Sequence, residues 1–468
     1  MKKSKLLIIF ERLGKWEIKQ FQQFVQSPFF NQRTDVIRLL DFLIQEKETG
    51  KSTYERAVAF RVVYPNKDFM ERDFYLLSSY LYKLLEEFLA IRAIRQNEVT
   101  MKLHLAQALQ KIKLDKKFTR TIDNSKKVLQ KQVFRNGNYL RQAYDLELAH
   151  YNFIGSQVRS AENNLQALSD LFDVYYLAEK LKQFCLQWAH QTVFKKEYDV
   201  GMQKEIFSFL ETHPDLFNHP AIAIYYHCYQ AIAFDDDVHF EKLLALIPQH
   251  QHQFPQSETR DIYLLAINFC IKQLNAGEQK YEAEMFALYQ TGIENKYLIK
   301  SEELSRFTFN NIVLLGIKLG KLEWVESFIY EQKQLLPKKL RQAVFEYSLA
   351  GLRYEQKQYA EAMRLLATFE SNDHLMNLGA KLTLLKIYYE LKEFDALYSL
   401  LDSMRVYLQR KEILGYHKAQ YGKIISLTKK LISLAPSNRA AKLALQQEIE
   451  SSTSLTRNIS LWLLRQLE

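Results

Sequence analysis

The stretch Tyr354–Leu366, YEQKQYAEAMRLL, places a short polar linker between two helical patterns. Tyr354 lies near the end of the first pattern, and Tyr359 opens the second. The segment Tyr388–Leu401, YYELKEFDALYSLL, repeats this arrangement 35 residues later, with Phe394 in the place of Tyr359. Because one helix, a turn and a second helix fill about this length, the recurrence predicts a stack of helical pairs.

The same kind of position recurs farther upstream. An apolar or aromatic residue follows a short polar or glycine-containing turn at six places, spaced 35 to 42 residues apart: Tyr198, Phe240, Tyr281, Leu322, Tyr359 and Phe394. An irregular bundle with aromatic core residues is the alternative, but a bundle gives no reason for regular spacing. We therefore expect an elongated α-solenoid in which each pair of helices contacts mainly its neighbours.

The segment LAGLRYEQKQYAEAMRLL resembles the tetratricopeptide repeat (TPR) family, and four residues occupy matching positions: Leu349, Ala350, Tyr359 and Ala362. The resemblance is best over residues 300–402, weaker over 98–300, and does not extend before residue 98. Lys357 and Lys392 stand where the family has a turn glycine, and Leu397 replaces its alanine. The resemblance implies an irregular, right-handed, TPR-like α-solenoid in which the first helix of each pair lines the concave surface.

The composition favours helices throughout. The chain has 468 residues with only 13 Gly and 8 Pro, whereas strong helix formers are abundant. Its opening is apolar only from Leu6 to Phe10, which is too short for a signal peptide. No later run approaches the roughly 20 apolar residues of a spanning helix. Three widely separated cysteines, Cys185, Cys228 and Cys270, predict free buried thiols. We expect an all-α, cytoplasmic protein with no membrane span.

Three parts are expected along the chain. Residues 1–96 are predicted to form a separate N-terminal helical domain, residues 97–450 the TPR-like repeats, and residues 451–468 a capping helix with Trp462 on its apolar side. The N-terminal part carries the motif QSPFFNQRTD and resembles the N-termini of an uncharacterised group of bacterial helical-repeat proteins. That resemblance implies no function.

The motif QSPFFNQRTD separates two predicted helices. Pro28 cannot continue the first helix, and Asn31 is predicted to cap the second, with Asp35 in its first turn. Phe29 and Phe30 are expected to plug the local core.

Residues 52–89 have the outline of a helix, a turn at Pro65–Asn66 and a second helix, which raises the possibility of DNA binding. A recognition helix needs polar and basic side chains that reach the groove. The second helix instead carries a series of large apolar and aromatic residues: Phe74, Leu76, Leu77, Tyr80, Leu81, Tyr82, Leu84 and Leu85. This pattern is typical of a buried packing helix, so nucleic-acid binding here is the minor alternative.

Sequence motifs for catalysis are absent. The chain has no HExxH, GxxxxGK[ST], GxGxxG or GxSxG string, and the SxxK pair of Ser426 and Lys429 has no companion motif. Six of the eleven histidines crowd into residues 213–252, near Asp235–Asp237. Converging imidazoles can bind a metal, but a solvated, incidental cluster is the simpler interpretation. We assign no catalytic residue, no metal and no cofactor.

The net charge of +10 is concentrated in one segment, because residues 101–150 alone carry +7. On a helical projection, four cations of this segment fall within about 60° of one another: Lys116, Arg120, Lys127 and Lys131. The opposite side carries Phe118, Ile122, Leu129 and Val133. A solvated face is the simplest interpretation. An acidic protein or a nucleic acid is the alternative partner, although no aromatic residue on this face could stack on bases.

Six residues are implied by the family's spacing as candidates for the concave surface: Asn310, Lys318, Tyr347, Tyr354, Lys386 and Tyr389. Tyrosines with scattered charges suit a peptide groove. The leading hypothesis is a non-enzymatic scaffold or adaptor that binds a protein or peptide through this groove or through the cationic helix face. The alternative is a regulator with a nucleic-acid-binding N-terminal region and a TPR-like sensor domain.

Overall fold

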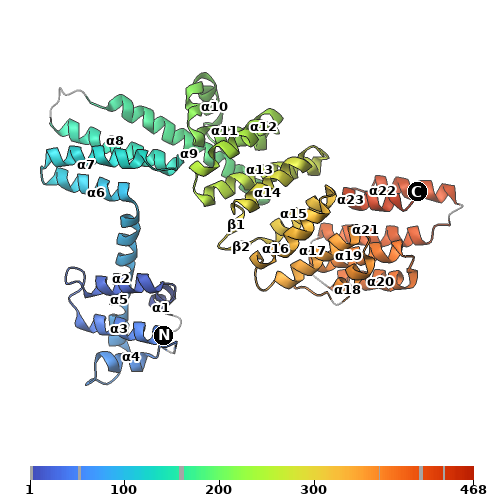
Figure 1. Ribbon diagram of the computed structural model, residues 1–468, viewed down its shortest axis with the longest axis horizontal. Helices are drawn as coiled ribbons and strands as arrows, with labels where there is room; N and C mark the ends of the chain where they lie inside the picture. The colour runs from blue at the N-terminus through green and yellow to red at the C-terminus, as the bar shows by residue number, and fades with distance from the viewer. Residues whose placement is uncertain are drawn as a thin grey trace. The chain divides into compact units, whose positions relative to one another are not determined.

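The computed structural model describes residues 4–50, 54–157, 163–194, 196–367, 369–410, 415–435 and 438–467. Among these residues are 23 α-helices, three short 3-10 helices and one antiparallel pair of two-residue strands, β1 (Ile299–Lys300) and β2 (Glu303–Leu304) (Figure 1). The all-α prediction is therefore confirmed.

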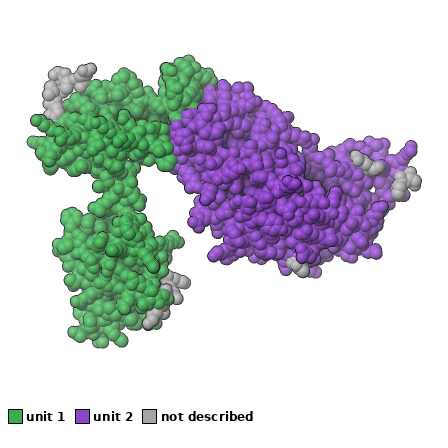
Figure 2. Space-filling view, in the orientation of Figure 1, with its two compact units in different colours: residues 1–182, 202–223 green, residues 183–201, 224–468 purple. Residues whose placement is uncertain are grey.

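The chain divides into two compact units (Figure 2). Unit 1 contains residues 1–182 and 202–223, and unit 2 contains residues 183–201 and 224–468.

Five helices build the first hydrophobic core of unit 1: α1 (Lys5–Phe10), α2 (Lys15–Gln26), α3 (Thr34–Glu48), α4 (Arg56–Val63) and α5 (Glu71–Gln96). The buried side chains described for this core lie between Leu6 and Phe88. The long helix α5 packs against α1, α2 and α3. It buries Phe74, Leu77 and Leu81, as the sequence predicted for a packing helix, but Leu76 is exposed.

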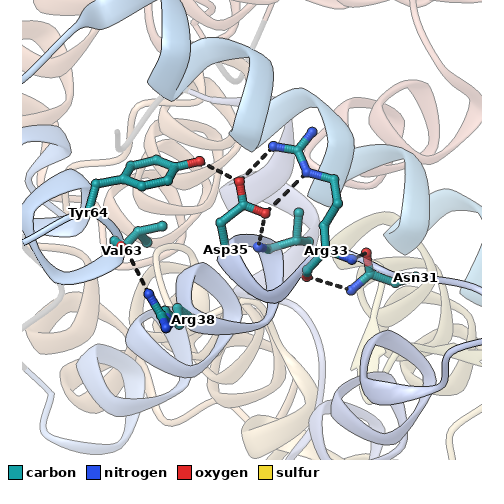
Figure 3. A network of polar contacts seen from close by, with 7 residues as sticks. Asn31, Arg33, Asp35, Arg38, Val63 and Tyr64 are labelled. Atoms are coloured by element: carbon teal, nitrogen blue, oxygen red, sulfur yellow. Dashed lines mark hydrogen bonds and ion pairs between the residues drawn. The ribbon is translucent and has the colours of Figure 1, made fainter. Parts of the chain in front are cut away.

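A polar network fixes the start of α3 against the end of α4 (Figure 3). The carboxylate of Asp35 accepts hydrogen bonds from the Arg33 guanidinium, from the Tyr64 hydroxyl and from the backbone N–H of Val36. Burial alone would raise the pKa of Asp35, but the hydrogen bonds from Arg33 and Tyr64 outweigh it, and the pKa is lowered. In addition, Arg38 donates to the carbonyl of Val63 at 3.3 Å.

Two predictions for the motif before α3 were wrong. Asn31 does not cap α3, because its buried amide instead donates to the carbonyls of Val25 (2.9 Å) and Arg33 (3.0 Å) and so ties the loop to the end of α2. Phe30 is half-buried and stacks on Phe24 at 3.9 Å, but Phe29 is 87% exposed and plugs no core.

The rest of unit 1 begins with an antiparallel group of helices, α6 (Glu98–Lys111), α7 (Asp115–Gln130) and α8 (Gly137–Gln157), which share a core. The 30-residue helix α9 (Leu165–Phe194) contributes residues to both units. Helix α10 (Gln203–Thr212) and the 3-10 helix η1 (Pro214–Asn218) follow, and α11 (Pro220–Phe234) begins in unit 1 and continues in unit 2.

Unit 2 continues with a series of packed helices: α12 (Asp237–His250), α13 (Gln256–Ala276), α14 (Tyr281–Glu294), α15 (Arg306–Lys318), α16 (Leu322–Gln332), α17 (Arg341–Glu355), α18 (Tyr359–Leu366), α19 (His374–Glu390), α20 (Phe394–Arg410), α21 (Gly415–Ile432), α22 (Arg439–Glu450) and α23 (Arg457–Arg465). Successive members pack against each other, most extensively α17 with α18, α13 with α14, and α19 with α20, followed by α20 with α21 and α15 with α16. The architecture is repeat-like, as predicted. The 3-10 helices η2 (Gln251–Gln253) and η3 (Lys333–Leu335) lie in connections.

The predicted openings of second helices are confirmed at four positions, because α14, α16, α18 and α20 begin at Tyr281, Leu322, Tyr359 and Phe394. Phe240 lies in the first turn of α12 but does not open it. The prediction that Tyr198 opens a helix was wrong. Tyr198 lies in the non-helical segment before α10, where its hydroxyl lies 2.9 Å from His190 Nδ1.

The turns inside these four pairs share one backbone geometry. Gly277, Gly320, Lys357 and Lys392 all have a positive φ, between 61° and 105°. In each turn this residue's N–H bonds to the carbonyl three residues back, and the next N–H bonds to the carbonyl five residues back. This is the Schellman pattern that satisfies the last carbonyls of a helix, and it normally favours glycine. The two lysines therefore occupy positions equivalent to the two glycines.

Candidate functional site

The predicted cationic helix face is present on α7. The helix buries Phe118, Ile122 and Leu129 against α6 and α8, so its opposite side faces solvent. Lys116, Arg120 and Lys127 are exposed there, and Lys131 is exposed at the C-cap of the helix. We call these four residues the basic face. Val133, predicted on the core side, is 62% exposed, because α7 ends at Gln130 before reaching it.

The cations of the basic face have no ion-pair partner among the residues that the structure describes. Lys126, on the flank of the same helix, shows the contrast, because it forms an ion pair with Glu147 of α8. That contact belongs to the packing of α7 on α8. The basic face instead presents four positive charges to solvent on about four turns of one helix.

The predicted groove residues of α15 and α17 are engaged within the protein. Asn310 accepts a hydrogen bond from Ser348 at 3.3 Å, and Lys318 forms an ion pair with Glu282 of α14. Tyr347 faces Gly379 of α19, where an added Cβ would lie 2.5 Å from the tyrosine hydroxyl. Glycine at this position therefore lets α17 and α19 approach closely.

The other predicted groove residues gather around the carboxylate of Glu390. Glu390, the last residue of α19, accepts hydrogen bonds from the hydroxyls of Tyr354 and Tyr359 and from the indole N–H of Trp462 at 3.0 Å. Lys357 lies 3.3 Å from the same carboxylate. Burial alone would raise the pKa of Glu390, but these hydrogen bonds and the lysine charge outweigh burial and lower it.

Aromatic packing completes this arrangement. The Lys386 ammonium lies 5.6 Å from the Tyr354 ring centroid and 5.7 Å from that of Trp462, and burial lowers the pKa of Lys386. Tyr389 contacts Trp462 edge to face at 5.7 Å. We call these six residues the Glu390 cluster: Tyr354, Tyr359, Lys386, Tyr389, Glu390 and Trp462. Trp462 comes from α23, so that helix contacts two of the six predicted groove residues, Lys386 and Tyr389.

The histidine-rich stretch is less solvated than predicted. His219, His227, His239 and His250 are half-buried, and only His213 and His252 are exposed. The Nδ1 atoms of His227 and His239 lie 2.9 Å apart, and burial together with the neighbouring imidazole lowers the pKa of His227 to about 4. No group of three metal-binding side chains converges within the described part of the chain. The three cysteines are free and buried, as predicted.

Within the described ranges, no helix combines the length and apolar character needed to cross a membrane. Comparisons with protein-family models, curated proteins and solved structures gave no match for this chain.

Proposed function

We propose that the protein is a non-enzymatic interaction scaffold that binds an acidic protein through the basic face of α7. The proposal includes a TPR-like, right-handed α-solenoid with a separate N-terminal helical domain, in the cytoplasm. The paired helices and the four shared turn geometries support the repeat architecture, and the free buried thiols suit a reducing compartment.

One observation carries the proposal: four exposed cations share one face of a well-packed helix and have no ion-pair partner among the described residues. A single exposed ion pair contributes only about 0–1 kcal/mol. Several like charges held on one rigid face, however, create a local potential that attracts and orients an oppositely charged partner. The helix needs no rearrangement to present them.

The groove is the weaker of the two predicted binding surfaces. Lys386 and Tyr389 pack against Trp462, so a peptide that used them would first have to displace α23. The hydroxyl of Tyr354 is already bonded to Glu390. The basic face requires no such displacement. Among acidic partners, a protein is favoured over a nucleic acid because the face offers no aromatic side chain for base stacking.

Binding of fluorescently labelled poly-L-glutamate tests the proposal at low and moderate salt. We expect saturable binding that weakens with salt and is lost in the double variant Lys116→Glu/Lys127→Glu. The matched control is Lys338→Glu/Lys339→Glu, which makes the same charge change at two exposed lysines of unit 2. Equal loss in both variants would show that only net charge matters and would refute a specific face.

A parallel titration with random-sequence duplex DNA distinguishes a nucleic-acid partner from an acidic protein. DNA binding that requires Lys116 and Lys127, without binding to poly-L-glutamate, would replace the protein partner with a nucleic acid.

A further inference from the structure

A groove between α2 and α5 carries a second candidate interaction surface in unit 1. It encloses a cavity of about 380 Å³, and its lining includes four aromatic residues and two arginines: Trp16, Phe24, Phe30, Phe88, Arg92 and Arg95. Small ligand pockets begin at about 300 Å³, so the cavity has room for one or two large side chains rather than for a whole domain.

The sequence of α2 explains why this surface is open. Ile18, Phe21 and Val25 face the core, so Trp16, on another side of α2, is left outside it. Trp16 is 65% exposed. The loop after α2 adds a second exposed aromatic residue, Phe29, whose ring contacts Phe30 edge to face at 4.9 Å.

The floor of the groove is already ordered. Phe24 stacks on Phe30 at 3.9 Å and lies 5.7 Å from Phe88, which is buried. A partner side chain would therefore meet fixed aromatic walls and would lose little free energy to ordering them. Exposed aromatic residues beside an ordered apolar floor are typical of protein-binding surfaces.

The charge of the groove selects the partner. Among the described residues, those that line it include no carboxylate. Arg92 is paired with Glu17, whereas Arg95 is exposed and has no ion-pair partner among the described residues. An anionic group is therefore the complement of Arg95, and its planar guanidinium suits a carboxylate.

Three glutamines in the same lining, Gln20, Gln23 and Gln96, offer both donors and acceptors. Peptide backbone groups need both kinds of partner. Two arginines with no lysine are a weak electrostatic footprint for a nucleic acid, which is bound largely through many phosphate contacts.

We propose that the α2–α5 groove binds an acidic peptide segment of another protein, with one bulky apolar side chain inserted among the aromatic residues and a neighbouring carboxylate on Arg95. This site shares no residue with the basic face and is independent of the function proposed above. Together the two surfaces would let the scaffold hold two acidic segments at once.

The test uses the full chain and a fluorescein-labelled peptide of alternating glutamate and aspartate with one central phenylalanine, followed by fluorescence anisotropy. We expect Arg95→Glu and Trp16→Ala each to weaken binding by about tenfold or more. Both side chains are exposed, so the variants should keep the circular dichroism spectrum and melting temperature of the wild type. Replacing the peptide's phenylalanine with alanine should weaken binding comparably.

Arg61→Glu is the matched control, because Arg61 is an exposed arginine of α4 that does not line the groove. It should leave the affinity within about twofold, and so should Lys116→Glu/Lys127→Glu, which keeps this test separate from that of the basic face. The proposal is overturned if the wild type shows no saturable binding, if Arg61→Glu weakens binding as much as Arg95→Glu, or if the peptides with and without phenylalanine bind equally. Binding of oligothymidylate instead of the peptide, with the same dependence on Trp16 and Arg95, would assign the groove to single-stranded nucleic acid.

Discussion

The basic face and the Glu390 cluster differ in whether their residues are exposed to solvent or engaged in contacts within the protein. The four cations were selected from the sequence by helical projection, and three members of the cluster, Tyr354, Lys386 and Tyr389, by the spacing of the family that the chain resembles. In the structure, the cations of the basic face are exposed and have no ion-pair partner among the described residues, whereas the Glu390 cluster satisfies its polar groups internally. The difference teaches that spacing identifies which residues share a face, while only the packing of distant helices decides whether that face is free.

The contrast also predicts opposite responses to mutation. Side chains that form hydrogen bonds and ion pairs with one another inside the protein support its stability. Their removal should lower the free energy of unfolding. Side chains that face solvent should contribute little to stability, and their loss should be measured in binding.

The largest effect is expected for Glu390→Ala. The variant leaves the Tyr354 and Tyr359 hydroxyls and the Trp462 indole N–H without their acceptor, and we expect it to cost about 3 kcal/mol. Denaturant unfolding measures this change. Glu355→Ala, which removes an exposed carboxylate of α17, is the control and should stay within about 0.5 kcal/mol. Equal effects of the two variants would remove the contrast between the surfaces.

A smaller loss, about 2 kcal/mol, is expected for Ala362→Tyr, because Ala362 is fully buried beside Tyr354 and Ile387 and a larger side chain overpacks that contact. In a repeat architecture, hydrogen exchange should show the loss of protection near residues 300–440, while residues 1–96 stay protected. The exposed neighbour offers a matched control, Ala360→Tyr, with little expected change. Protection lost evenly along the chain would contradict the solenoid.

The Glu390 cluster should also weaken in acid. The pKa of Glu390 is lowered from an ordinary value of 4.5, so its contribution is fully present above about pH 4.5 and is lost as the pH falls through its pKa in the folded protein. The stability difference between the wild type and Glu390→Gln, about 1 kcal/mol at pH 7, should therefore shrink below about pH 4.5. A difference that grows in acid would show that the carboxylate is not stabilised in the fold.

The smallest effect on stability is expected for Lys116→Glu/Lys127→Glu. Both side chains are exposed and have no ion-pair partner in the described part of the chain, so the free energy of unfolding should change by less than about 0.5 kcal/mol. The same variant should lose binding to poly-L-glutamate. A large loss of stability would indicate that the basic face supports the fold.

Local signals predicted much of the fold. Tyr281, Leu322, Tyr359 and Phe394 open helices because a polar linker and an apolar helix face are both encoded within a few residues. Tyr198 has the same local pattern but lies within an irregular segment, so the pattern alone was insufficient.

The candidate sites depended on longer-range information. The two faces of α7 could be predicted from the residues of that helix alone. Three of its four predicted core positions are buried. Two of the predicted groove residues, Lys386 and Tyr389, contact Trp462, which lies 72 residues beyond Glu390, and local spacing gives no information on such a distant contact. Similarly, the apolar character of Phe29 does not reveal that its ring points into solvent.

The turn geometry has a consequence for how the period of this chain is recognised. Gly277 and Gly320 occupy the left-handed position in the first two turns, and Lys357 and Lys392 occupy it in the last two, with a positive φ and the same hydrogen bonds. A left-handed backbone costs a residue with a side chain roughly 1–2 kcal/mol. Each lysine is therefore less favourable at its position than glycine would be. The positions of the repeats can therefore be recognised from the positive φ in all four turns, whereas a search for turn glycines would find only the first two.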